Sequence, residues 1–406
     1  MAHTLFALTG MSRARGCLSL VALAALAACG GGQSTDASGQ ASVSASADKF
    51  AHFGYGRGGR WGRDSEAQTA PAPAPAPAPT PSPAVEPTPS PAAPNTTMTA
   101  TTPAVDRAKI PTGAVGYASD LLKPTTQQPN DSDIGAFRTV CDFSHMAFDD
   151  PIVYPGQPGR SHLHAFFGNT GIDANSTAES IARSGNSTCR GGTINRTGYW
   201  APAVIDTRDG APVKPDLLVV YYKTGYHGIA PKAVQPIPPG LRMIAGDSSA
   251  SAPTPGGHAS FACVDPNTGG GPTTVELPST CPIGSKLLAG VIFPQCWDGV
   301  HLDSPDHKSH MAYPINGGCP ATHPVPFPEI QLGFWYTVTD AAAVAHWRLA
   351  SDNYDSSIPA GYSLHADWFN GWKPEFMQSF IQNCEQASKD CFSHLLGNGQ
   401  EMFGGP

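Results

Sequence analysis

Histidine and aspartate side chains gather in one short stretch of the chain, residues 293–324, with the sequence FPQCWDGVHLDSPDHKSHMAYPINGGCPATHP. Its thirty-two residues include four histidines and three aspartates, but few aliphatic side chains. Imidazole and carboxylate groups act as general acids and bases, and they also bind divalent metals. Ordinary strands and helices rarely need so many of them together, so this stretch predicts a functional site.

A second polar segment, SHLHAFFGN, covers residues 161–169 and contains two further histidines. If it forms a strand, His162, His164 and Phe166 lie on one face, because side chains alternate along a strand. Two imidazoles on one face can share a metal ion or hold a substrate hydroxyl between them. The alternative is a pair of structural histidines held by hydrogen bonds.

The run Asp306-His307-Lys308-Ser309-His310 places a carboxylate beside one histidine and a second histidine three residues later. On one helical turn the two imidazoles would be adjacent, and an aspartate beside an imidazole can fix its tautomer and raise its basicity. We therefore expect the two segments to converge on one centre. The candidate catalytic residues are His162, His164, Asp306, His307 and His310, and the candidate ligands of a divalent metal are His162, His164, His307 and His310.

Aromatic and polar side chains near these histidines suggest a sugar-binding surface. Indole rings stack on the C–H faces of sugars, while carboxylates and hydroxyls bind sugar hydroxyl groups. The candidate substrate-binding residues are Trp297, Asp298, Asp303 and Tyr313. Two other tryptophans, Trp368 and Trp372, precede an expected helix, and for them we favour packing in the core.

The first residues have the pattern of a bacterial export signal. Arg13 and Arg15 precede an apolar run, residues 18–28, which is too short to span a bilayer. The run ends in Leu-Ala-Ala-Cys-Gly, which resembles a lipobox and predicts Cys29 as the lipidated first residue of the mature protein. We expect an exported protein anchored by lipid to a bacterial membrane, most simply the outer one, with its domain in the periplasm or at the cell surface.

The other cysteines agree with export. Besides Cys17 in the signal and Cys29, eight remain, an even number that predicts disulfides in an oxidising compartment. Sequential pairing is the simplest arrangement, although eight cysteines allow 105 pairings. The predicted disulfide cysteines are Cys141, Cys189, Cys263, Cys281, Cys296, Cys319, Cys384 and Cys391.

Composition divides the chain into three parts. Residues 1–28 are the expected signal, and residues 29–108 have the composition of a disordered tether, Gly/Ser-rich and then Pro/Ala-rich. Eleven prolines in residues 71–94 favour extended polyproline II. Residues 109–406 can form one large domain. The net charge of −8 argues against a nucleic-acid partner.

The elements that must position the site are mainly strands. Short apolar or aromatic runs bounded by Gly, Pro and Asp predict strands at residues 198–205, 217–222, 287–293 and 332–338. One helix is expected from Pro374, with Phe376, Phe380, Ile381 and Cys384 on one stripe. The expected fold is mainly β: a single β-sandwich or jelly-roll-like domain with long loops, stapled by disulfides, with one C-terminal helix.

Four motifs in order carry a family resemblance: residues 149–170, 187–202, 293–314 and 365–372. They closely resemble the DUF1996 family of secreted fungal and bacterial proteins of unknown function, over about residues 141–384. The resemblance implies extracellular placement. Some members carry a carbohydrate-binding WSC module, which implies a glycan setting, but the resemblance supplies no catalytic residues.

Two functions follow from these observations. The first is a carbohydrate-active enzyme, a polysaccharide hydrolase or lyase with a His/Asp centre. The second is a non-catalytic surface module that binds glycan or metal. The expected partner is a polysaccharide or glycan, and the membrane is contacted only through the lipid anchor.

Overall fold

The structure is a computed structural model that describes residues 105–406. The predicted signal, the candidate lipidation residue Cys29 and nearly all of the tether lie outside the described residues, so the predicted domain boundaries stay predictions. No helix in the described part is long and apolar enough to cross a membrane.

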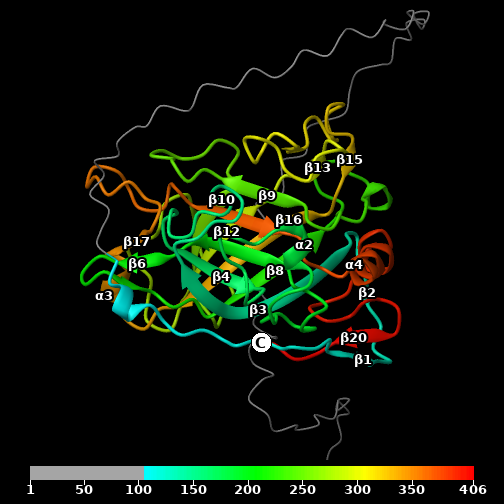
Figure 1. The fold of residues 1–406 in the computed structure, drawn as a ribbon, viewed down its shortest axis with the longest axis horizontal. Coiled ribbons are helices and arrows are strands. Elements are labelled where there is room, and N and C mark those ends of the chain that lie inside the picture. The colour runs from blue at the N-terminus through cyan, green and yellow to red at the C-terminus, as the bar shows by residue number, and fades with distance from the viewer. Residues whose placement is uncertain (1–104) are drawn as a thin grey trace, which may run out of the picture. The chain divides into compact units, whose positions relative to one another are not determined.

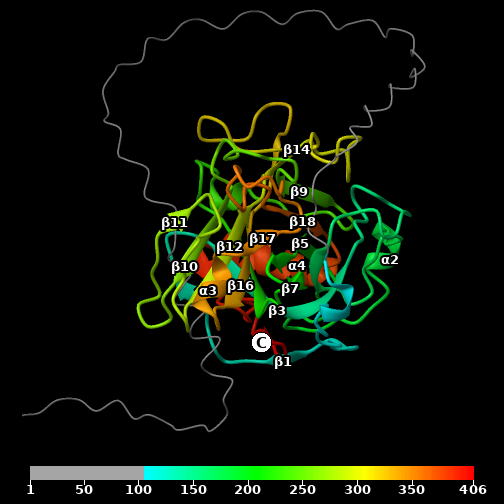
Figure 2. The ribbon, with the colours of Figure 1, turned by 90° about the vertical axis from the view of Figure 1, so that its left-hand side faces the viewer.

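Most strands of residues 105–406 belong to one large, almost entirely antiparallel sheet (Figures 1 and 2). Along its main path the order is β11-β10-β12-β16-β8-β3-β4-β5-β18-β9, and β19 and β2 attach beside β3. The strands are β2 (Asn130–Asp131), β3 (Ala136–Ala147), β4 (His164–Gly168), β5 (Gly198–Pro202), β8 (Leu217–Lys223), β9 (Arg242–Gly246), β10 (Ala259–Val264), β11 (Thr273–Thr274), β12 (Lys286–Ile292), β16 (Glu329–Thr337), β18 (His365–Phe369) and β19 (Lys389–Asp390).

Smaller sheets and short helices lie around the large sheet. The small sheets pair β1 (Leu122–Pro124) with β20 (Gln400–Met402), β13 (Cys296–Trp297) with β14 (Met311–Ala312) and β15 (Val325–Pro326), and β6 (Val204–Asp206) with β7 (Ala211–Pro212) and β17 (Trp347–Leu349). The helices are α2 (Ala178–Ile181), α3 (Ala341–Val344) and α4 (Pro374–Phe380), with 3₁₀ turns η2 (Arg107–Lys109) and η3 (Pro231–Ala233) and a π-helical turn η4 (Ile381–Glu385).

The large sheet curls because its longest strand is shared between two halves. The first part of β3 pairs with β8, and its last part pairs with β4, with a register shift within this pairing between Phe143 and His145. Such an irregularity bends a strand and increases its twist. The sheet therefore curls until the edge strand β9 approaches β12. The expected mainly β, disulfide-stapled fold with one C-terminal helix is confirmed.

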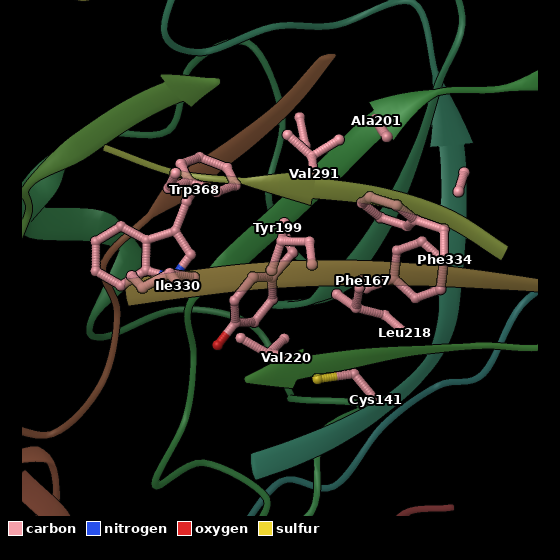
Figure 3. Packing of buried hydrophobic residues seen from close by; sticks show 14 of the residues in the cluster. Cys141, Phe167, Tyr199, Ala201, Leu218, Val220, Val291, Ile330, Phe334 and Trp368 are labelled. Carbon is pink, nitrogen blue, oxygen red and sulfur yellow. The ribbon is translucent and has the colours of Figure 1, made fainter. Parts of the chain in front are cut away.

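The inner face of the curled sheet holds the main hydrophobic core. Figure 3 shows side chains from different strands pointing toward one another, among them Phe167, Tyr199, Phe334 and Trp368, all of which are buried. Trp372 is also buried, and its indole N–H donates to the Tyr222 hydroxyl at 2.9 Å. The prediction that Trp368 and Trp372 pack in the core is confirmed.

The outer face of the β4-β5-β18-β9 half carries a second, smaller apolar cluster. Phe166 and Trp200 lie on this face and pack with Ile152, from the segment before β4, and with Ile172 and Ile181, from the segment after it. Because side chains alternate, His164 lies on the same outer face as Phe166, while Ala165 and Phe167 face the main core. The candidate site thus lies at the end of a covered sheet face.

The four predicted strands are all present, with small changes at their ends. The predicted run 198–205 divides into β5 and β6, and the other three correspond to β8, β12 and β16. The helix beginning at Pro374 is also present as α4, continued by the π-helical turn η4. It buries Phe380, Ile381 and Cys384 as expected, whereas Met377 replaces the half-buried Phe376 in the core.

The eight domain cysteines form four disulfides, and the pairing is sequential, as the simplest arrangement predicted. The bridges are Cys141–Cys189, Cys263–Cys281, Cys296–Cys319 and Cys384–Cys391. The third bridge closes the polar segment of residues 293–324 at its base, so this long irregular segment is held to the domain at both β13 and Cys319.

An ion-pair cluster on β16 should give stability a distinct pH dependence. Burial raises the pKa of Glu329, but hydrogen bonds and charge from His227 and Lys223, each 3.2 Å away, outweigh burial and lower it. The hydrogen bond that His227 donates to Glu329 raises the pKa of His227. The Glu329 contribution is lost as pH falls through its lowered pKa, and the His227 contribution is lost as pH rises through its raised pKa.

Glu329→Gln should therefore destabilise the protein most at about pH 5–6.5, where carboxylate and imidazolium are both charged. The expected loss is about 1.5–3 kcal/mol, the range for hydrogen bonds to charged groups. Urea unfolding at pH 3, 5.5 and 8 measures it, with Glu179→Gln in the exposed Arg183 pair as control. An equal loss at all three pH values would contradict the assignment.

Candidate metal centre

Three imidazoles meet on the outer face of the large sheet, at the ends of two strands. His164 is the first residue of β4 and His365 the first of β18, and His162 precedes β4 by two residues. β5 lies between these strands, and its Pro202 pairs with His164. Since Asp367 pairs with Trp200, His365 is level with Pro202 as well. This register brings His164 and His365 to the same level of the sheet, and the His162 ring lies against both.

The rings are close enough to share one ion. Their centroids are 4.2 Å apart for His162 and His164, 5.0 Å for His162 and His365, and 5.7 Å for His164 and His365. One nitrogen from each ring lies within 4.8 Å of the other two.

Hydrogen bonds fix the tautomers of two of these histidines. His164 Nδ1 lies 2.9 Å from the Asp149 carbonyl oxygen, and His365 Nδ1 lies 2.8 Å from the Ser363 carbonyl oxygen. A carbonyl can only accept, so each Nδ1 carries the proton and donates it, and in the neutral ring Nε2 keeps its lone pair. Backbone carbonyls orient metal-binding histidines in this way in many proteins.

The free nitrogens lack other partners. Nε2 of His162 and Nε2 of His164 are buried, and neither forms a hydrogen bond within residues 105–406. Most buried polar atoms have a partner, so two unsatisfied ring nitrogens side by side require an explanation. A shared cation provides one.

Burial keeps the cluster neutral. It lowers the pKa of His164 to about 4, and burial followed by repulsion from His164 lowers the pKa of His365 to about 4. Burial and then its two neighbours hold the pKa of His162 well below its ordinary value. At neutral pH all three rings are therefore unprotonated, which is the form that binds metals.

Two buried carboxyl groups lie beside the histidines. Asp367 follows His365 by two residues on β18, and both of its oxygens are buried with no hydrogen-bond partner in the described part of the chain. Burial, followed by the charge of Asp150, raises the pKa of Asp367. Asp150 is also buried; its Oδ1 accepts hydrogen bonds from the amides of Ile152 and Val153.

The predicted residues of the other polar segment make a hydrogen-bonded loop. His310 uses both ring nitrogens, with Ser304 Oγ at 2.9 Å and the Arg242 carbonyl at 2.7 Å. His307 Nδ1 lies 3.0 Å from Asp303, which also pairs with Arg242 at 3.0 Å. Within residues 105–406, the group of three imidazoles contains neither His307 nor His310.

Asp306 shapes the same loop. Its Oδ1 accepts hydrogen bonds from the Ser309 amide at 2.9 Å and the Ser304 hydroxyl at 2.7 Å. These bonds, the Ser309 amide foremost, lower the pKa of Asp306. The Asp306 carboxylate therefore serves to hold a turn of the loop.

The loop nevertheless reaches the histidine cluster through Lys308. Its Nζ donates to the Gly246 carbonyl at 2.8 Å, and Gly246 on β9 is the cross-strand partner of His365. The Lys308 ammonium also acts electrostatically on His365 and Asp367. The two polar segments therefore approach the same end of the sheet, with Lys308 as the connection.

The predicted sugar-binding residues lie in three different places. Trp297 donates its indole N–H to the His301 carbonyl and stacks on Phe327, while Asp298 accepts from the backbone and ring of His301. Tyr313, by contrast, lines a cavity of about 220 Å³ that Lys308 also lines. Asp303 remains within the loop.

Sequence reasoning missed His365 and Asp367 as functional residues. The prediction from this part of the sequence concerns only the packing of Trp368 and Trp372. The available signal was the alternation of polar residues 365 and 367 with buried apolar residues 366 and 368, which is typical of a strand with one polar face.

The chain belongs to the family described as "Domain of unknown function (DUF1996)", whose model matches residues 150–372. The match includes His162, His164, His365 and Asp367. No curated protein and no solved structure matches the chain.

Proposed function

We propose that this exported protein is a metal-dependent hydrolase or lyase that acts on polysaccharide, with its metal bound by His162, His164 and His365. The observation that carries the proposal is the convergence of three neutral imidazoles whose available Nε2 atoms include two that are buried and unpaired. Imidazole ligands suit Zn, Cu, Fe and Ni, and Mn is compatible where carboxylates also take part.

Three protein ligands are typical of a catalytic site, because the remaining coordination position can take water or substrate. A divalent ion there would supply Lewis acidity and lower the pKa of a coordinated water. Asp367, with two unpartnered oxygens beside His365 and a pKa raised by burial, is the chain's own group for transferring a proton as a general acid or base. Asp150 is fixed by the amides of Ile152 and Val153, and its negative charge adds to the rise in the pKa of Asp367.

One observation favours a non-catalytic metal-binding module. His164 is fully buried and His365 is 3% exposed, so only the partly exposed His162 connects the cluster to the surface. A site with such a narrow approach suits a tightly held ion. In the enzyme, substrate would replace the ligand at the remaining coordination position of the metal. In the binding module, it would not.

Removing and restoring the metal distinguishes them. Purified protein should contain about one equivalent of a transition metal, and dialysis against a chelator should abolish depolymerisation of the substrate in a panel of acidic and neutral polysaccharides. Adding back Zn, Mn or Cu should restore it. Asp367→Asn should retain metal but lose turnover by about 10²–10⁴-fold, the usual contribution of a general acid or base.

Retained metal with no turnover of any polysaccharide would support the binding module. Absence of metal from protein purified without chelator, together with no uptake on addition of Zn, Mn or Cu, would contradict both versions.

The disulfides agree with an exported protein. Lipid attachment at Cys29 and location at the outer membrane remain part of the proposal.

A further inference from the structure

A cavity of about 220 Å³ lies at the β9 edge of the sheet, next to the histidine cluster. Ile244, Ala245 and Gly246 form one side, and Lys308 and Tyr313 belong to the other. Gly246 pairs with His365, and Lys308 bonds to Gly246. Gly246 and Lys308 therefore lie between the cavity and the histidine cluster.

The backbone at this border approaches closely. Gly246 has a φ of +85°, and a Cβ there would lie 2.3 Å from the Leu364 carbonyl oxygen. Only glycine fits this conformation and this space. The absence of a side chain at Gly246 lets the end of β9 lie directly against the backbone of Leu364 and His365.

Lys308 is the cation of the cavity lining. Its side chain is exposed, and within residues 105–406 its ammonium donates one hydrogen bond, to the Gly246 carbonyl. An ammonium has three donors, so two are available to a ligand. Asp247 lies within electrostatic range of Lys308, but its Oδ1 accepts from the amide and hydroxyl of Ser249 at 2.9 and 2.7 Å.

Aromatic rings form another part of the lining. His258 and Tyr313 are stacked with centroids 3.6 Å apart and planes 5° from parallel. The Tyr313 hydroxyl donates to the Ile292 carbonyl at 2.8 Å, which fixes the pair. The cavity is smaller than the roughly 300–1,000 Å³ of pockets for drug-sized ligands, so it suits a single ring rather than a large aglycone.

We propose that this cavity is a subsite for one acidic sugar unit, whose carboxylate or sulfate is bound by the Lys308 ammonium while its ring lies along the aromatic pair. This inference rests on the proposed function and specifies its substrate class as an acidic polysaccharide. The adjoining histidine cluster would then act on the bond next to the bound acidic unit.

Binding of defined oligosaccharides to the metal-loaded protein tests the inference. Isothermal titration should detect binding of oligogalacturonate or of a sulfated galactan oligosaccharide. The ligand that binds identifies carboxylate or sulfate as the recognised group. A neutral galactan oligosaccharide of equal length should bind at least about tenfold more weakly, and affinity for the acidic ligand should fall with salt, because the contact is ionic.

Matched lysine variants locate the contact. Lys308→Met should weaken acidic-ligand binding about tenfold, as expected for loss of one charged hydrogen bond, and Lys308→Arg should retain most of it. Lys232→Met, at an exposed lysine of η3, should have no effect. Metal content should be unchanged in all three.

Equal affinity for neutral and acidic oligosaccharides, unchanged binding by Lys308→Met, or failure of every acidic ligand to bind would overturn the subsite. Metal content distinguishes failure of the subsite from failure of the proposed function. A protein that holds metal through its three histidines, but binds neutral and acidic oligosaccharides equally, refutes the subsite alone.

Discussion

His365→Ala should reduce metal affinity by more than about 100-fold. Changing a residue that only orients a metal ligand already costs 10–100-fold, and this change removes a ligand itself. His164→Ala should behave in the same way, since its Nε2 faces the same point. Metal content after dialysis and titration with a chromogenic chelator measure the loss.

The matched control is His307→Ala, a histidine of the other polar segment. Its ring lies against Asp303 and outside the group of three imidazoles, so metal affinity should change by less than about threefold. The sequence had placed His307 and His310 among the metal ligands. If His307→Ala loses metal while His365→Ala retains it, the sequence-based ligand set is right and the set inferred from the structure is wrong.

Thermal unfolding provides a readout independent of activity. At a metal concentration 100-fold above Kd, wild type should gain about 2.7 kcal/mol of stability. His365→Ala should gain less than about 0.4 kcal/mol from the same metal, because a more than 100-fold loss of affinity leaves the metal concentration below its Kd. Stabilisation of wild type and the variant to the same extent would mean that the metal binds elsewhere.

The fold was predictable where local pattern determines it. β8, β12 and β16 are continuous apolar runs, and Pro374 followed by an apolar stripe identifies α4. The longest strand, β3, was not predicted. Its sequence mixes Arg138, Asp142 and His145 with apolar residues, because its two halves belong to different parts of a curled sheet. That pattern follows no single period, and only the tertiary bend explains it.

The site was predictable in part for a related reason. The H-x-H spacing at residues 162 and 164 indicated a shared face, and the three rings do meet there. The third histidine comes from β18, which is about 200 residues away in the sequence and becomes level with β4 only through the register of β5. Neither composition nor local spacing determines the order of strands in a sheet, so a histidine-rich loop seemed the better partner.

The Cys141–Cys189 bridge should be the most stabilising of the four disulfides. It closes a separation of 48 residues, compared with 7 for Cys384–Cys391. In the chain-entropy model, these separations correspond to about 4 and about 2.4 kcal/mol of stabilisation. Paired alanine variants of each bridge, unfolded in urea under oxidising conditions, measure both contributions.

The same bridge should leave metal affinity almost unchanged in the folded protein. It holds the segment around Thr188, whose hydroxyl accepts from the Gly168 amide at the last residue of β4, whereas His164 lies at the first. The double variant Cys141→Ala/Cys189→Ala should therefore bind metal within about threefold of wild type at low temperature, although it unfolds at a lower urea concentration. If the double variant lost metal binding but kept its stability, the prediction would be wrong. The bridge would then position the histidines rather than stabilise the domain. A larger loss of stability on removing Cys384–Cys391 would instead contradict the loop-length argument.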